Sequence, residues 1–195
     1  MTMKLMLPAV LSLRSSTPSR TLFARLLPSH IGIPTKTQTQ TMAFHYKPNT
    51  EPPTDMRVFK NITKVASESA KFRRVLWTGR SSQLVIMTIP VKGEIGQEIH
   101  GVDQHLTFHS GTAKAVVNGK TEHIGPGDVV IVPAGAEHNF INTGQTPLIL
   151  STVYAPAEHK ADTVHENLEE GESLEDDGKD EPPDWATELH KPFKQ

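Results

Sequence analysis

The chain has 195 residues and a mass of 21.5 kDa, which suits one domain of common size with extensions rather than two domains. Residues 1–157 hold 16 basic and 9 acidic side chains, whereas residues 158–195 hold 4 and 13, so an acidic tail follows a mildly basic body. The basic residues form no dense cluster, so no nucleic-acid partner is expected. The lack of cysteine excludes disulfide frameworks, thiolate metal sites and a cysteine nucleophile.

The first 50 residues have the composition of an import signal. They hold six basic residues, no acidic residue and many Ser and Thr, which is typical of mitochondrial transit peptides. We predict a disordered leader and linker over residues 1–55 and a mitochondrial location. The alternative is a cytoplasmic protein, either with an uncleaved extension or translated from Met42. No apolar run reaches 18 residues, so no membrane span is expected.

The predicted domain spans residues 56–157 and consists mostly of short β-rich runs separated by turn residues. A weak helical pattern over 59–70, capped by Asn61 or Thr63, precedes them. Asn118-Gly119 is a strong hairpin signal. Many short strands without intervening helices predict an antiparallel sandwich or barrel. The expected strands are 73–78, 83–89, 103–109, 114–117, 120–124, 128–132, 138–142 and 148–154.

Residues 158–195 are predicted to form a solvated acidic tail. The stretch 166–177 is dense in like charge and offers little to bury. A short helix around 164–169 and one or two helical turns over 183–189 are the only regular structure expected there.

Two stretches of the β region carry the residues best suited to chemistry. In the later one, Gly127 precedes a buried run, Pro133 and Gly135 reverse the chain, and His138 enters the next strand. In the earlier one, Glu98 and His100 are two residues apart, so on a strand they project to the same face. Gln104 falls on a core-facing stripe, where its amide needs a partner.

The spacing of these residues resembles the cupin superfamily. The later stretch matches the second cupin motif, Gly-x5-Pro-x-Gly-x2-His-x3-Asn, at every fixed position and ends on Asn142. In the first motif, His100 takes the place of the second histidine, Glu98 that of the first histidine, and Gln104 that of the glutamate. The phrases VPAGAEHNFINTG and TVYAPAEHKADTVH look like small single-domain cupins loosely labelled mannose-6-phosphate isomerase-like. The resemblance covers residues 72–156.

The resemblance implies an all-β jelly-roll fold, an antiparallel double-stranded β-helix of the RmlC-like type, and one divalent metal ion. The ligands would be Glu98, His100, Gln104 and His138. Two imidazoles and a carboxylate have the composition of a facial triad for Fe(II), and they equally suit Mn, Ni or Zn. A metal-free polar cluster is the alternative, although it would bury Glu98 without a cation unless a histidine were protonated.

Three classes of function follow from such a site. The first is a metal-dependent small-molecule enzyme of dioxygenase type, in a mostly apolar pocket. The second is a sugar or sugar-phosphate isomerase, which needs Lys or Arg at the pocket mouth to bind phosphate. The third is a protein that binds a small ligand without turnover. We expect the first of these, and the substrate and catalytic residues are not identified.

Other polar residues are assigned to the surface. Arg73, Arg74 and Lys114 are interpreted as surface charges, and by parity His105 and His109 face away from the site. The resemblance implies a homodimer, because cupins often pair through edge strands, and uncovered sheet edges supply a physical reason.

Overall fold

The structure, a computed structural model, describes residues 44–187. The predicted leader up to residue 43 and the last residues of the tail lie outside the described residues. Ten strands are present in the described part of the chain: β1 (Arg73–Thr78), β2 (Gln83–Ile89), β3 (Glu98–Ile99), β4 (Asp103–Ser110), β5 (Ala113–Val117), β6 (Lys120–Ile124), β7 (Val129–Val132), β8 (Glu137–Asn142), β9 (Leu148–Ala155) and β10 (Val164–His165). The helices are α1 (Ile62–Ser69), α2 (Leu168–Asp176) and α3 (Asp184–Thr187).

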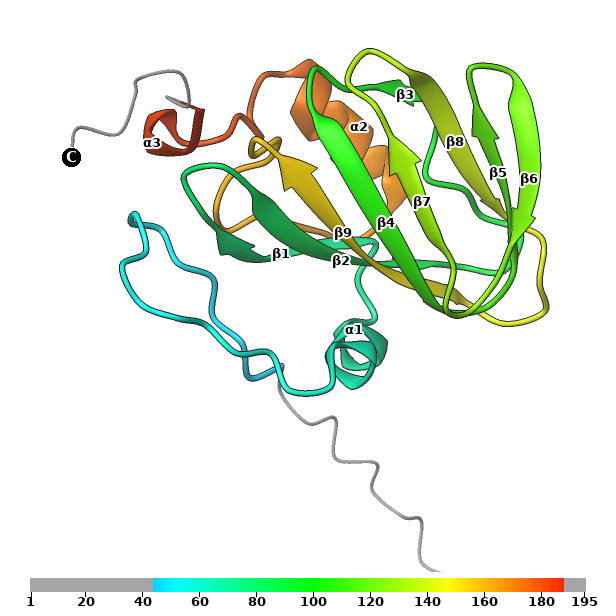
Figure 1. The fold of residues 1–195 in the computed structure, drawn as a ribbon, viewed down its shortest axis with the longest axis horizontal. Helices are drawn as coiled ribbons and strands as arrows, with labels where there is room; N and C mark the ends of the chain where they lie inside the picture. The colour runs from blue at the N-terminus through cyan, green and yellow to red at the C-terminus, as the bar shows by residue number, and fades with distance from the viewer. Residues whose placement is uncertain (1–43, 188–195) are drawn as a thin grey trace, which may run out of the picture. The chain divides into compact units, whose positions relative to one another are not determined.

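The strands form two antiparallel sheets that face each other (Figure 1). The larger sheet has the order β10-β1-β2-β9-β4-β7, and the smaller has the order β3-β8-β5-β6. Strands next to each other in a sheet are often far apart in the sequence, as with β4 and β9. This confirms the predicted all-β jelly-roll architecture.

Turn residues explain why the strands end where they do. Asn118 and Gly119, between β5 and β6, have φ angles of 47° and 76°, as a two-residue hairpin turn of type I′ requires. Gly111 has a φ of 82°, and a Cβ atom there would lie 2.7 Å from the carbonyl oxygen of Pro147. The predicted bounds of the long strands therefore agree with the structure to within one residue.

The main core lies between the two sheets. Phe108 of β4 and Phe140 of β8 are fully buried, and their ring centroids are 5.6 Å apart across the core. Val85, Met87 and Leu106 from the larger sheet belong to the same apolar cluster. Packing of this kind, rather than hydrogen bonding alone, holds the sheets face to face.

A second apolar cluster covers the outer face of the larger sheet. Val65 and Ala66 of α1 pack against Leu76 and Ile86, whose neighbours along the strands face the main core. The side chain of Asn61, one of the two caps predicted from the sequence, caps α1 by accepting a hydrogen bond from the amide of Lys64 at 3.2 Å. Two aromatic residues of the predicted linker, at positions 44 and 46, also pack against this cluster.

The acidic segment after residue 157 differs from the prediction of a solvated tail. Strand β10 pairs with β1, and α2 follows it with Asn167 as its N-cap. Gly171 lets α2 approach closely, because a Cβ atom there would lie 3.0 Å from Nδ1 of His165. Asp180 is 5% exposed. The prediction missed this packing because polar contacts, and not apolar ones, hold most of it.

None of the helices within residues 44–187 combines the length and the apolar character that crossing a bilayer requires.

Candidate metal centre

Strand pairing brings two of the predicted ligands together. Glu98 of β3 lies directly opposite His138 of β8 in the antiparallel register. Residues opposite each other project to the same face of a sheet. His100 follows Glu98 by two residues and returns to that face, as the sequence predicted.

The turn before β8 fixes the orientation of His138. Gly135 has a φ of 79°, and the amide of Ala136 closes the turn on the carbonyl of Pro133 at 3.0 Å. Nδ1 of His138 donates to the carbonyl of Ala136 at 2.9 Å, so Nε2 carries the free lone pair. Burial lowers the pKa of His138, which keeps the ring neutral. Nε2 is buried and has no hydrogen-bond partner among the described residues.

The last residue of the same motif has a structural role. Nδ2 of Asn142 donates to the carbonyl oxygens of Ile89, Pro90 and Thr146, and Oδ1 accepts from the amide of Gly144. Asn142 therefore ties two loops to the end of β8 and lies outside the candidate site.

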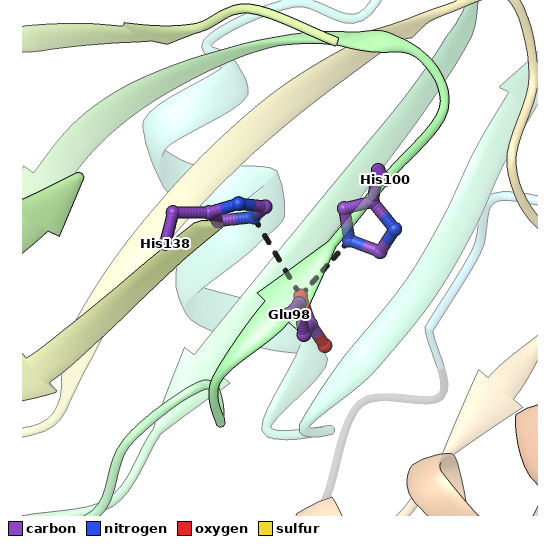
Figure 2. A group of neighbouring side chains, drawn as sticks. All are labelled: Glu98, His100 and His138. Carbon is purple, nitrogen blue, oxygen red and sulfur yellow. Dashed lines mark hydrogen bonds and ion pairs between the residues drawn. The ribbon is translucent and has the colours of Figure 1, made fainter. Parts of the chain in front are cut away.

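Three side chains converge on one point between the strands (Figure 2). Nε2 of His100 lies 3.0 Å from Oε2 of Glu98, and Nε2 of His138 lies 3.9 Å from the same oxygen. One donor atom from each residue lies within 4.8 Å of the other two. Glu98 and His100 retain 12% and 8% side-chain exposure, whereas His138 is more deeply buried.

Electrostatics keeps Glu98 ionised in this buried position. Burial raises the pKa of Glu98, but the charge of Arg73 and the hydrogen bond to His100 outweigh it and lower the pKa to about 2. Burial lowers the pKa of His100, but its hydrogen bonds to Glu158 and Glu98 outweigh it and raise the pKa to about 9. Without metal, His100 is therefore protonated at neutral pH, between two carboxylates.

Arg73 was interpreted from the sequence as a surface charge, and this was wrong. Its side chain is 1% exposed, and Nη2 donates to Oε1 of Glu98 at 3.0 Å. Nη1 donates to Oε1 of Glu175 on α2. Arg73 and Val75 are two residues apart on β1, so their side chains point to the same face of the strand. This spacing from an apolar residue indicated that Arg73 is buried. The two carboxylates that make this burial tolerable lie 25 and 102 residues away in the sequence.

Gln104 is buried as predicted, at 1% exposure, on β4 of the facing sheet. Both polar atoms of its amide lack a hydrogen-bond partner among the described residues. A buried amide with no partner is costly, so this side chain has unused capacity to bind a ligand or water. No hydrogen bond joins Gln104 to the other three predicted ligands.

A second polar group, not identified from the sequence, lies in the segment after β9. Nδ1 of His159 lies 2.9 Å from Oδ2 of Asp180 and 3.7 Å from Oε1 of Glu175. Thr163 donates to the other oxygen of Asp180. Burial lowers the pKa of His159 to about 4, so the ring is neutral. These residues come from loops and from α2, where no strand parity could predict their direction.

The candidate site opens into a cleft of about 650 Å³. Its lining residues come from three stretches of the chain: 97–102 around β3, 156–159 after β9, and 172–187, which includes parts of α2 and α3. Among the described residues, no Lys or Arg lines the cleft, and seven carboxylates do: Glu98, Glu158, Glu172, Glu175, Asp176, Asp180 and Glu181.

Two other histidines lie away from the site, as their parity predicted. His105 is exposed on β4. The ring of His109 lies near Thr63 of α1 at 3.2 Å and near Ser151 at 2.9 Å, on the outer face of the larger sheet.

The converging residues fit a divalent metal ion. Two imidazole nitrogens and a carboxylate oxygen are suitable donors, and Nε2 of His138 is already free of other partners. Nδ1 of His100 lies 3.0 Å from Oε1 of Glu158, the kind of outer contact that orients a ligating imidazole. A metal ion would take the place of the proton that His100 shares with Glu98.

Comparisons with known proteins agree with this architecture. Residues 85–154 match the model of the cupin domain family. The uncharacterized protein YrkC of Bacillus subtilis is 37% identical over 123 residues, which are 60% of this chain and 66% of that protein. The uncharacterized protein L612 of Acanthamoeba polyphaga mimivirus is 36% identical over 104 residues, which are 51% of this chain and 65% of that protein. The chain thus spans just under two thirds of the length of these curated relatives.

A solved structure is similar in both sequence and fold. The crystal structure of BH2720 from Bacillus halodurans matches with a TM-score of 0.59 and 34% identity. The match covers 60% of this chain and 95% of that one.

Proposed function

Because the chain belongs to the cupin superfamily, we propose that it is a metal-dependent enzyme for a small molecule, of the dioxygenase type predicted from the sequence. The observation that carries the proposal is the convergence of Glu98, His100 and His138 on one point at the side of an open cleft. Two histidines and one carboxylate are the ligand set of Fe(II) oxygenases, which leave coordination positions open for substrate. Mn, Ni and Zn are accommodated by the same donors.

The protein's own residues would prepare this site in three ways. Glu98 supplies the negative charge that favours a cation, and Glu158 orients His100. Gln104 offers an unpartnered buried amide for a ligand or water. A metal ion bound here would supply Lewis acidity to a chelating substrate.

The charge of the cleft bears on the substrate. Seven carboxylates line it, whereas a mostly apolar pocket is expected for a dioxygenase. A phosphate group requires Lys or Arg, and neither lines the cleft in the described part of the chain. The cleft therefore favours a neutral or cationic substrate over a sugar phosphate, and the isomerase alternative lacks the residues it needs.

The test is the metal content of the purified untagged protein, measured by elemental mass spectrometry beside His138→Ala. We expect about one equivalent of a divalent metal in the wild type and its loss in the variant, since one of three ligands is removed. His105→Ala, which removes an exposed histidine on β4, is the control and retains the metal. Equal metal content in all three proteins would contradict the site.

The reaction class is tested with the loaded protein. Oxygen uptake with small chelating substrates such as diketones and phenolics, dependent on His138, is the expected result. A loaded protein that binds such compounds without any turnover would instead be a binding protein.

A further inference from the structure

Glu98 occupies a position where two kinds of partner compete for its carboxylate. Oε2 faces the imidazoles of His100 and His138, whereas Oε1 accepts from Nη2 of Arg73 at 3.0 Å. A free carboxylate can bind a metal ion with one oxygen or with both. Here one of its oxygens is already engaged by a guanidinium.

Arg73 is itself fixed from the opposite side. Its Nη1 donates to Oε1 of Glu175, which belongs to α2, and its guanidinium lies 5.6 Å from the ring centroid of Phe72. Burial lowers the pKa of Arg73, but Glu98, Tyr154 and Glu175 outweigh it and keep the side chain charged. The planar guanidinium therefore contacts two carboxylates with two separate nitrogens, a geometry that the single ammonium nitrogen of lysine does not reproduce.

The helix α2 is placed for this contact. Gly171 lies one turn before Glu175, and a Cβ atom at residue 171 would lie 3.6 Å from Nη1 of Arg73 and 3.0 Å from His165. A larger side chain at residue 171 would press on the buried pair. Because glycine has no side chain, α2 can approach β1 and β10 closely enough for Glu175 to contact Arg73.

We infer that Arg73 and Glu175 are positioning residues of the metal centre. Arg73 holds Oε1 of Glu98 so that the carboxylate offers only Oε2 to the metal, and Glu175 holds Arg73. This inference rests on the proposed metal site. It adds that the geometry of the site depends on α2, a helix that lies outside the residues 85–154 that match the cupin domain. One-oxygen ligation leaves one more coordination position for substrate than two-oxygen ligation would.

The alternative is that Arg73 is only a buried counter-charge, which stabilises the fold without affecting how Glu98 binds a metal. The two roles differ in the effect of Arg73→Lys. This substitution keeps the positive charge but offers one nitrogen in place of two, so it cannot reproduce both contacts in their present geometry. A counter-charge would tolerate it, whereas a positioning residue would not.

The experiment measures the affinity of the full-length protein for Zn²⁺ and Co²⁺ by competition with a chromophoric chelator. Arg73→Lys is expected to weaken binding about 10- to 100-fold, as loss of an outer contact to a metal ligand does. Glu175→Gln, which acts on Glu98 only through Arg73, is expected to weaken binding by a smaller factor. Glu172→Gln is the matched control. It removes the same charge from the same helix and the same cleft, but Glu172 does not contact Arg73, so affinity stays close to that of the wild type.

The visible spectrum of bound Co²⁺ gives a second readout that a purely structural role would not change. When Glu98 is released by Arg73→Lys, it can chelate with both oxygens, and the higher coordination number weakens the Co²⁺ absorption. Circular dichroism and melting of the metal-free variants check the fold. Should Arg73→Lys fail to fold, Glu175→Gln carries the test.

The outcomes separate this inference from the proposed function. A wild type that binds no metal would overturn the proposed function. A wild type that binds metal, together with Arg73→Lys and Glu175→Gln variants of equal affinity and unchanged Co²⁺ spectrum, would overturn only the inference. An equal loss of metal affinity in Glu172→Gln and Glu175→Gln would show that the effect comes from the general negative charge of the cleft. That result would also overturn the inference.

Discussion

His100 lies between Glu98 and Glu158, with one ring nitrogen 3.0 Å from each carboxylate. This contact raises the pKa of His100 from 6.5 to about 9 in the metal-free protein, despite the opposing effect of burial. The protonated form is therefore favoured by folding. Its stabilising effect is fully present below pH 6.5, the value of a histidine in the unfolded chain, and is lost as the pH rises through 9.

We predict that the metal-free protein loses stability between pH 6.5 and 9 and that His100→Gln flattens this part of the profile. Urea unfolding at a series of pH values, in the presence of a chelator, measures it. If the free energy of unfolding of His100→Gln falls between pH 6.5 and 9 as steeply as that of the wild type, another titrating group is responsible for the decline.

Arg73 illustrates how far residue-level reasoning from the sequence extends. Parity on a strand correctly predicted that Glu98 and His100 share a face, that Gln104 is buried and that His105 and His109 point elsewhere. It could not identify a buried arginine, because burial of a charge depends on partners. Those partners are distant in the sequence, so no local pattern reports them.

At the scale of elements, α1 ends in an unusual conformation. Its C-cap, Ala70, has a φ of 50° and a ψ of 16°, in the left-handed region that favours glycine. The side chain at residue 70 is exposed, so a glycine would lose little packing. We predict that Ala70→Gly stabilises the protein by about 0.5 to 1 kcal/mol, because it relieves the left-handed strain at the cap.

Thermal unfolding of this variant beside the wild type checks the prediction. Ser67→Gly is the contrasting variant: it places glycine inside the helix and is expected to destabilise the protein by about 0.5 to 1 kcal/mol. Destabilisation by both substitutions would show that the cap is not strained.

Elements differ in how well the sequence predicts them, and the reason is physical. The strands β2 and β6 were predicted with their observed bounds, because apolar or β-favouring runs there stop at turn residues. The elements β3 and β10 have two residues each and exist only through pairing with β8 and β1. The helix α2 is polar over most of its length, and its contacts with Arg73 depend on the folded barrel.

At the scale of the whole molecule, the two sheets leave edge strands. β7 pairs only with β4 among the described strands, and Val129 and Ile131 on it are 56% and 59% exposed. An exposed edge with apolar side chains can pair with another chain. We therefore propose β7 as the contact surface of the homodimer expected from the sequence.

We predict that the protein is a dimer in solution and that Ile131→Glu converts it to a monomer without loss of the fold, since the new charge would be buried without a partner in the interface. Analytical ultracentrifugation measures the mass of the protein in solution. Met56→Glu, at an exposed apolar residue outside the sheets, is the control. A wild type that is monomeric at micromolar concentration would contradict the prediction.

The buried contact between Arg73 and Glu175 joins residues 102 positions apart, near the two ends of the described chain. Translation proceeds from the N-terminus, so the barrel strands with Glu98 and His138 leave the ribosome well before α2 does. During that interval Arg73 has no Glu175 to engage. In the nascent chain, Glu98 and His138 are therefore present before the contact that is proposed to hold Arg73, and the candidate centre can be completed only after α2 has been made.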